Sequence, residues 1–255
     1  MKEYPHSICM GYPIFTGSLK DLSIDKKLIV NTINQYSYCI AEEDDDFQKA
    51  LKESDVLLPD GVGIVKASSF LNNENIQKIA GADLHTFLLK ELQKNGGSCF
   101  YMGSSEKTLA KIEKRIAREY PNIRVGTYSP PFKPELSETD NLEIRRAVNS
   151  FRADVLFVGM TAPKQEKWIS SQKDFLDANV ICAIGAVFDF YAGTVDRPSK
   201  FWIESNKEWM GRLIKEPRRM WKRYVLYGAF FGYYLLKEKF KGQNRTNGSN
   251  VKVNA

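Results

Sequence analysis

The sequence predicts an α/β protein with a Rossmann-like, doubly wound and mostly parallel sheet. Short apolar runs typical of buried strands alternate along the chain with longer segments typical of helices. Three of the later apolar runs end at a glycine that precedes a helix, at Gly103, Gly159 and Gly185. Because the carboxyl ends of parallel strands share one edge of a sheet, these glycines should open onto a common crevice.

Each element follows from its local pattern. Runs rich in β-branched or other apolar residues predict strands at Leu28–Ile33, Val56–Leu58, Ser98–Met102, Asn122–Tyr128, Asp154–Val158 and Val180–Ile184. Apolar periodicity and capping residues predict helices over Asp21–Leu28, Asn34–Leu51, Ile64–Leu71, Leu84–Lys94, Glu106–Tyr120, Asp140–Phe151 and from Lys164 to Ile169. Glycine and proline interrupt the apolar stretch His6–Phe15, which favours a small hairpin there.

Length and cysteine content narrow the class of protein. A chain of 255 residues can form one large α/β domain, or a domain with an appendage. The four cysteines are scattered and form no CxxC, which argues against a metal centre or a disulfide framework. Residues 1–6 lack the apolar stretch of a signal peptide. We therefore expect a reducing, cytoplasmic setting.

The charge is unevenly distributed, which suggests a division of the chain. The net charge is +6, and the segment Arg197–Lys241 holds twelve basic residues against four acidic ones. We predict a catalytic core over 1–195, a basic aromatic appendage over 196–241 and a disordered polar tail over 242–255.

The appendage contains an uncharged aromatic run, Tyr224–Leu236, between clusters of basic residues. Its thirteen residues are fewer than the ~18–20 that a membrane-spanning helix needs. The run therefore either lies at a membrane interface or packs on the core as a C-terminal helix.

An acid stands at the end of the second predicted parallel strand. Asp60 follows Pro59 and is flanked by Gly61 and Gly63. In the crevice of an open sheet, its carboxylate could meet a substrate hydroxyl while the glycines let a ligand approach the backbone. An ordinary Asp-Gly turn would have the same local sequence.

A second acidic feature, the run Glu42–Asp46, contains the pattern Asp-x-Asp that many sugar transferases use to hold a metal. It falls within a predicted helix rather than at a strand end. We interpret it as a solvated acidic face and predict no metal site.

Several motifs occur together in a characteristic order. They are Thr32-Ile-Asn34, Leu58-Pro-Asp-Gly-Val-Gly63, Gly81-Ala-Asp-Leu84, Gly159-Met-Thr-Ala-Pro-Lys-Gln-Glu166, Gly185-Ala-Val-Phe-Asp-Phe-Tyr-Ala-Gly193, Arg197-Pro198, and Glu208-Trp209 with Arg212-Leu213 and Glu216-Pro-Arg-Arg219. This succession closely resembles the WecG/TagA/CpsF family of bacterial glycosyltransferases over residues 5–225.

The resemblance implies an inverting glycosyltransferase that needs neither a metal nor a cofactor. Such enzymes move a sugar, best known as N-acetylmannosamine or a related hexose, from a UDP-sugar to a polyprenyl-diphosphate-linked sugar. They serve teichoic acid, capsule and other surface polysaccharide synthesis. The resemblance also implies a Rossmann-like core with an appendage that completes the active site at the inner face of the plasma membrane. The protein could also form a homo-oligomer.

The resemblance also assigns roles to individual residues. The catalytic base falls on Asp60, and a threonine proposed to contact substrate falls on Thr32. A phosphate-associated arginine of the family is replaced by Lys78, which keeps the charge but loses the bidentate fork. The remaining family positions fall on Gln165, on Arg212 and Arg219, and on Lys222 or Arg223.

Without a metal, the charge that develops on the UDP leaving group needs other partners. Helix N-termini near Gly103 and Gly159 and the appendage arginines are candidates. For other residues two interpretations stay open. Thr32 and Asn34 could contact substrate or cap the next helix, Gln165 could lie on a helix surface, and Asp189 could bind the donor or its own backbone. We expect His85 to be structural.

Two other functional classes share this fold. A nucleotide-binding oxidoreductase is disfavoured because no G-x-G-x-x-G follows the first strand. A basic nucleotide- or nucleic-acid-binding protein without transferase activity is the alternative that the charge of the appendage permits. The uncharged aromatic run fits a lipid interface better than phosphate tracking, so we predict no nucleic acid partner.

Overall fold

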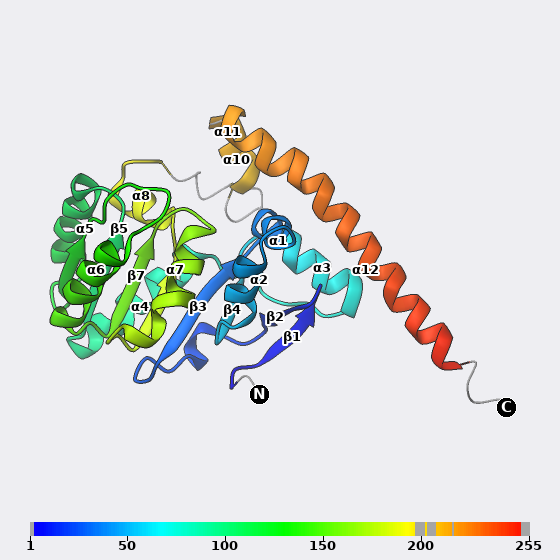
Figure 1. Ribbon diagram of the computed structural model, residues 1–255, viewed down its shortest axis with the longest axis horizontal. Helices are drawn as coiled ribbons and strands as arrows, with labels where there is room; N and C mark the ends of the chain where they lie inside the picture. Colours follow the sequence, from blue (N-terminus) through cyan, green and yellow to red (C-terminus); the bar gives the residue numbers. More distant parts are fainter. Residues whose placement is uncertain (1–2, 197–201, 203–207, 216, 251–255) are drawn as a thin grey trace.

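A six-stranded parallel sheet forms the centre of the protein (Figure 1). The computed structural model describes residues 3–196, 202, 208–215 and 217–250, without the side chains of 215, 219 and 242–250. The strand order is β4-β3-β8-β7-β5-β6. The strands are β3 (Leu28–Ile33), β4 (Val56–Pro59), β5 (Ser98–Gly103), β6 (Arg124–Tyr128), β7 (Val155–Gly159) and β8 (Val180–Ala183). The predicted fold class is confirmed.

Helices cover both faces of this sheet, which explains why its strands read as continuous apolar runs. Alternate strand residues point to opposite faces: Tyr101 and Phe157 pack in one core cluster, and Phe100 and Leu156 in another. The first cluster includes residues of α4, α5 and α8, and the second includes residues of α6 and α7. The helices of the core are α1 (Gln35–Ala41), α2 (Asp45–Lys52), α3 (Val62–Asn72), α4 (Gly81–Asn95), α5 (Glu106–Glu119), α6 (Glu138–Phe151), α7 (Lys164–Gln172) and α8 (Val187–Ala192).

The predicted hairpin is present, but the helix predicted after it is not. Strands β1 (His6–Cys9) and β2 (Tyr12–Phe15) pair in an antiparallel two-stranded sheet. Beyond them the expected helix over Asp21–Leu28 is wrong, because only the short 3-10 turn η1 (Leu19–Asp21) forms. Its capping box closes a single turn, and Leu22 then turns extended to bury its side chain.

The single helix predicted over Asn34–Leu51 is two helices, α1 and α2. The break falls in the acidic run, where the Asp44 carboxylate accepts a 3.0 Å hydrogen bond from the Phe47 backbone N–H and so caps α2. The Lys167 ammonium lies 3.0 Å from the same carboxylate. The acidic run therefore lies at a helix junction rather than within a helix, because a capping side chain outweighs the apolar periodicity there.

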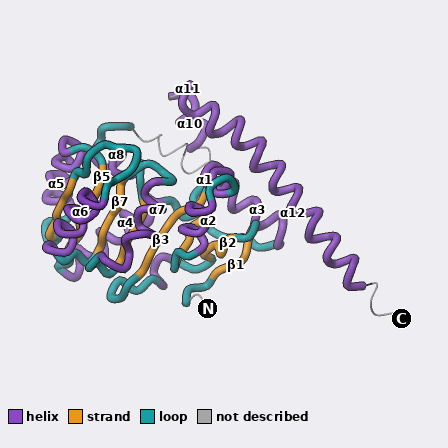
Figure 2. Tube along the Cα trace, viewed as in Figure 1, coloured by secondary structure: helices purple, strands orange, loops and turns teal. Residues whose placement is uncertain are grey.

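The C-terminal part forms helices that reach back to the core. They are α10 (Glu208–Lys215), α11 (Pro217–Trp221), the π-helical turn η3 (Lys222–Leu226) and α12 (Tyr227–Asn250). Figure 2 shows α12 running past α1 and α3. One side of α12 is buried: Phe231 packs edge-on against Tyr38 with ring centroids 5.5 Å apart. The segment therefore packs on the core, as one of the two interpretations predicted.

The opposite side of α12 is exposed. Phe230, Tyr233, Leu236 and Phe240 all present their side chains to solvent. Among the helices that the structure describes, none is both long and apolar enough to cross a lipid bilayer. The helical backbone of α12 continues to Asn250, into the segment 242–255 for which we predict disorder, and the proposed domain boundaries stay a prediction.

We predict that the docking of α12 depends on Phe231. Replacing this side chain, which is 6% exposed, with alanine should cost about 3 kcal/mol of packing and raise amide exchange in α12 roughly 100-fold. Phe230→Ala is the matched control, because the Phe230 ring is next to Phe231 in the sequence but is 46% exposed. Hydrogen exchange with mass spectrometry makes the comparison, and equal exchange in the two variants would contradict the prediction.

Candidate active site

The candidate base stands where the ladder between two neighbouring strands ends. Asp60 directly follows β4, and its backbone N–H donates to the Ile33 carbonyl of β3 at 2.9 Å. The Ile79 N–H donates to the Pro59 carbonyl at 3.0 Å, which brings the segment containing Lys78 beside the end of β4. Asp60 and Lys78, 18 positions apart in the sequence, therefore meet at the carboxyl edge of the sheet.

The pKa of Asp60 reflects charges from three separate parts of the chain. The pKa of this carboxyl is raised to about 6, mainly by desolvation and also by the negative charge of Glu208. The positive charges of Arg223, Lys78 and Arg212 oppose this rise. The structure therefore brings three of the predicted cationic residues to the predicted base. Glu208, which lies in one of the motifs but was assigned no role from the sequence, also acts on this carboxyl.

The two arginines are positioned by aromatic rings of the core. The Arg223 guanidinium carbon lies 4.7 Å from the ring centroid of Tyr36, in the first turn of α1. The Arg212 guanidinium carbon lies 5.4 Å from the ring centroid of Phe190 in α8. Burial lowers the pKa of Arg223, while the adjacent Lys222 is exposed. Of the two basic positions left open by the sequence, Arg223 is the one whose charge acts on the Asp60 carboxyl.

Two predicted positions in the C-terminal part cannot be placed. The side chain of Arg219 lies outside the described residues, although its backbone belongs to α11. The motif Arg197-Pro198 also lies outside them. Figure 1 shows α10 and α11 on the same side of the sheet as α1 and α8, whose rings hold Arg223 and Arg212.

The contacts at the end of β3 show which of Thr32 and Asn34 caps the next helix. Asn34 is the cap of α1, because its side-chain oxygen accepts from the N–H groups of Tyr36 at 3.0 Å and Ser37 at 3.1 Å. Thr32 lies on β3 opposite Leu58 and is half-buried. The capping interpretation therefore describes Asn34 and not Thr32.

The glycines after Asp60 lie close to the start of α1. Gly61 has a φ of 115°, which favours glycine. A Cβ at Gly63 would lie 2.7 Å from the Gln35 side-chain oxygen. The loop thus packs closely against the start of α1, which fixes Asp60 relative to Asn34. Contact of these glycines with substrate stays a prediction.

The three strand-end glycines do meet at one edge of the sheet. Gly103 and Gly159 are partners in the β5–β7 register, and the Gly185 N–H donates to the carbonyl of Val158. A Cβ at Gly103 would lie 2.4 Å from the Gly159 carbonyl oxygen, and one at Gly159 would lie 2.5 Å from the Phe188 ring. Close approach of backbone and ring therefore requires glycine at both positions.

Gln165 is buried rather than on a helix surface. It lies in the first turn of α7, and its side-chain N–H donates to Glu166 Oε1 at 2.8 Å. Burial raises the pKa of Glu166 to about 7. A Cβ at Gly185 would come within 3.3 Å of the Gln165 amide oxygen, so the amide lies over this glycine. Glu166 is a second residue that lies in one of the motifs but was assigned no role from the sequence.

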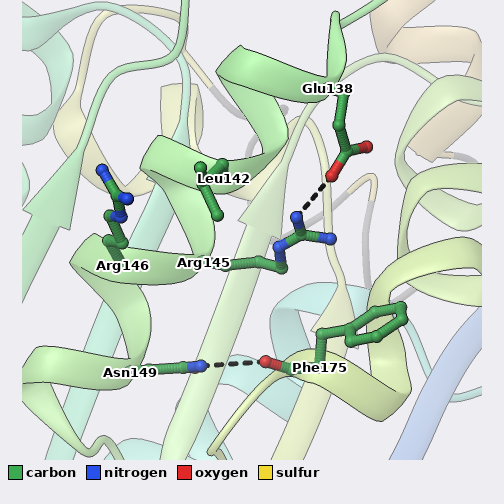
Figure 3. Close-up of a pocket in the computed structure, with 6 residues that line it drawn as sticks. All are labelled: Glu138, Leu142, Arg145, Arg146, Asn149 and Phe175. Carbon is green, nitrogen blue, oxygen red and sulfur yellow. Dashed lines mark hydrogen bonds and ion pairs between the residues drawn. The ribbon is translucent and has the colours of Figure 1, made fainter.

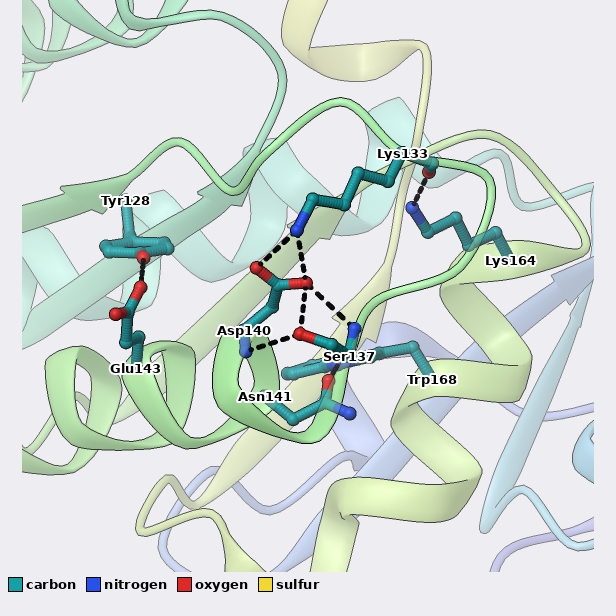
Figure 4. Close-up of polar contacts among 8 residues, drawn as sticks. All are labelled: Tyr128, Lys133, Ser137, Asp140, Asn141, Glu143, Lys164 and Trp168. Carbon is teal, nitrogen blue, oxygen red and sulfur yellow. Dashed lines mark hydrogen bonds and ion pairs between the residues drawn. The ribbon is translucent and has the colours of Figure 1, made fainter.

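Polar contacts fix the start of α7 against the preceding loop (Figure 4). The Lys164 ammonium donates to the Lys133 carbonyl at 2.6 Å, and the Lys133 ammonium pairs with Asp140 at 2.9 Å. The Trp168 indole N–H donates to the Asn141 side chain at 2.9 Å. These contacts hold the turn of α7 that carries Gln165 in one place.

Two further polar residues have local partners. The Asp189 carboxylate accepts from the Thr194 hydroxyl at 3.1 Å, while its carbonyl accepts the Thr194 N–H. The Asp189 side chain thus closes a turn after α8, and donor binding by it stays a prediction. His85 is structural, as expected. It is buried 2.6 Å from the Tyr101 hydroxyl, and burial lowers its pKa to about 3.

Two surface grooves lie away from Asp60. One is lined by residues of α6 with Phe175, where Arg145 spans from Glu138 to the Phe175 ring (Figure 3). The other runs between α1 and α12 and is lined by Cys39, Glu43, Ala229, Phe230, Tyr233 and Tyr234. Neither groove is lined by a residue predicted for the site. Within the described part of the chain, no cluster of three or more His, Cys, Asp or Glu side chains could hold a metal ion.

Comparison with known proteins assigns this arrangement to a family. A family model described as "Glycosyl transferase WecG/TagA/CpsF family" matches residues 15–245. An N-acetylglucosaminyldiphosphoundecaprenol N-acetyl-beta-D-mannosaminyltransferase of Bacillus subtilis (strain 168) is 31% identical over 229 residues, covering 89% of this chain and 87% of the relative. An enzyme of the same name from Bacillus spizizenii is 29% identical over 211 residues, covering 82% and 80%.

We predict that the pKa of Asp60 follows the charges around it. Arg223→Gln should raise this pKa because the carboxylate loses a cation, and Glu208→Gln should lower it because an anion is removed. Lys222→Gln, which removes an exposed neighbouring charge, should leave it close to about 6. Carbon-detected NMR titration of the Asp60 carboxyl measures all three. A shift in Lys222→Gln as large as that in Arg223→Gln would show that net charge, and not position, sets the pKa.

Proposed function

Because the chain belongs to the WecG/TagA/CpsF family of glycosyltransferases, we propose that it transfers N-acetylmannosamine or a related hexose from a UDP-sugar. The acceptor is a sugar linked through diphosphate to a polyprenol, as the names of the relatives state for those enzymes. The product enters teichoic acid or another surface polysaccharide. The observation that supports this proposal is a half-buried carboxyl at the edge of the sheet, Asp60, whose raised pKa is opposed by the positive charges of Lys78, Arg212 and Arg223.

In the proposed reaction, Asp60 is the general base of a single displacement. It takes the proton of the acceptor hydroxyl while that oxygen forms a bond to the anomeric carbon of the donor. The bond from that carbon to the UDP oxygen breaks, and its electron pair leaves with UDP, so the configuration inverts. A pKa of about 6 suits this role, since the carboxylate is ionised near neutrality yet more basic than an ordinary aspartate.

The cations near Asp60 offset the negative charge of the leaving group without a metal. Arg212 and Arg223 offer planar forks that match phosphate oxygens, and Lys78 adds a point charge. These two arginines come from α10 and η3, so the C-terminal segment supplies part of the proposed site. Thr32, half-buried at the end of β3, is a proposed substrate contact on the neighbouring strand.

The same C-terminal segment carries a large exposed apolar surface, which we propose contacts the inner face of the plasma membrane. Its exposed side chains are Trp209, Ile214, Trp221, Val225, Leu226, Phe230, Tyr233, Leu236 and Phe240. Exposed lysines at 222, 237 and 241 accompany them. Apolar and basic side chains together favour an anionic lipid surface over a nucleic acid. Contact there would bring the arginines to the place where a lipid-linked acceptor resides. A homo-oligomer stays a prediction.

We predict that Asp60→Asn lowers the rate of sugar transfer by about 10²–10⁴-fold, because the amide cannot accept the hydroxyl proton. The assay measures UDP release with a panel of UDP-sugars and a polyprenyl-diphosphate-N-acetylglucosamine analogue. Unchanged binding of UDP serves as the control for folding. Wild-type turnover by this variant would remove Asp60 from its role.

The pH dependence of the wild-type transfer rate is a second test of Asp60 as the base. A base must be ionised, so the rate should fall as the pH drops through about 6 and stay level above it. Glu208→Gln, which lowers the Asp60 pKa, should move this limb to lower pH. A limb that stays in place would assign it to another group.

We predict that Phe230→Ser combined with Tyr233→Ser reduces binding to anionic liposomes by at least tenfold. Each change removes an exposed apolar side chain from the proposed membrane face. Phe175→Ser is the matched control, because this ring is 59% exposed on the turn η2 (Lys173–Phe175). Flotation measures binding, and gel retardation of DNA by the wild type tests the nucleic acid alternative. Equal loss in the control variant would contradict the proposed surface.

A further inference from the structure

The first turn of α7 contains two buried polar side chains that the proposed proton transfer does not use. Gln165 is 5% exposed and Glu166 is 2% exposed. They contact one another through the 2.8 Å hydrogen bond from the Gln165 amide nitrogen to Glu166 Oε1. Within the described part of the chain, Gln165 Oε1 and Glu166 Oε2 have no hydrogen-bond partner. Buried polar atoms without partners are rare, and they call for an explanation.

The hydrogen bond between the two residues determines which way the Gln165 amide faces. An amide has a donor end and an acceptor end, and the donor end of Gln165 faces Glu166 Oε1, which accepts its N–H. The carbonyl end of Gln165 is thereby left as the free acceptor. It lies over Gly185, at the ends of β7 and β8, where a Cβ would come within 3.3 Å of it and within 3.2 Å of the Met160 carbonyl oxygen.

The residues around this amide suit an uncharged, hydrogen-donating group. The Gln165 and Met160 carbonyl oxygens are both acceptors, so they would repel phosphate oxygens. The Glu166 carboxyl already stands in the first turn of α7, where negative charge complements the helix N-terminus. The cations that suit a diphosphate are instead gathered around Asp60.

We propose that Glu166 is a positioning residue that holds the Gln165 amide so that its carbonyl oxygen accepts a hydrogen bond from the uncharged part of the nucleotide-sugar. The group bound is a hydroxyl of the sugar or an N–H of the base, and the diphosphate binds elsewhere. This inference rests on the proposed function, and it assigns the start of α7 to donor selection. It also gives a physical reason for a glutamate next to the glutamine in the Pro-Lys-Gln-Glu motif.

The test compares four variants by steady-state kinetics. Glu166→Ala removes the acceptor for the Gln165 N–H, and the donor KM should rise about tenfold while the acceptor KM stays within twofold. Glu166→Gln keeps a carbonyl that can accept the same hydrogen bond, and the donor KM should stay within threefold of wild type. Gln165→Leu should match Glu166→Ala, and the double variant should be no worse than Gln165→Leu alone.

Calorimetric titration with UDP and with the UDP-sugar locates the bound group without relying on turnover. If the amide hydrogen-bonds the base, Glu166→Ala should weaken the binding of UDP and of the UDP-sugar equally. If it hydrogen-bonds the sugar, only the binding of the UDP-sugar should be weakened. Either pattern supports the proposal. A wild-type donor KM in Glu166→Ala, an equal rise in donor and acceptor KM, or additive losses in the double variant would overturn it. Absence of sugar transfer by the wild type would instead refute the proposed function.

Discussion

A half-buried carboxyl at the edge of a parallel sheet sets the main constraint on this protein. Burial makes the ionised form of Asp60 costly and raises its pKa, and each nearby charge matters more there than it would in water. Glu208 and three cations then hold that pKa near 6. A carboxyl that is ionised at neutral pH yet more basic than an ordinary aspartate is the result of this balance, and no single neighbour produces it.

That balance makes the core and the C-terminal segment interdependent. Arg212 and Glu208 come from α10, and Arg223 comes from η3, while Asp60 and Lys78 belong to the core. The aromatic rings of Tyr36 and Phe190 hold the arginines, and Phe231 anchors α12 beside Tyr38. The same segment exposes apolar side chains on its other side, so the proposed contact with a lipid surface would be linked to the proposed completion of the site.

Close packing accounts for much of what looks like ligand chemistry in the sequence. Gly63, Gly103 and Gly159 each face an atom of the protein that a Cβ would strike. Asn34 caps a helix, and Asp189 closes a turn. In contrast, the Gln165 amide faces no hydrogen-bond partner on its carbonyl side among the described residues. The contrast separates positions whose residue type the fold explains from one that a ligand would explain.

The sequence by itself determined the fold class, because strands buried on both faces must be apolar throughout and helices between them must be amphipathic. It also indicated Asp60, Lys78, Arg212 and Arg223, through their motifs and the family resemblance. It misplaced helix ends near Asp21 and Asp44, where single capping contacts outweigh periodicity. Only the tertiary structure decided that Glu208 acts on Asp60 and that Glu166 is buried against Gln165. A glutamate in a helix has the same local sequence whether it faces solvent or the core, and packing between distant segments makes that choice.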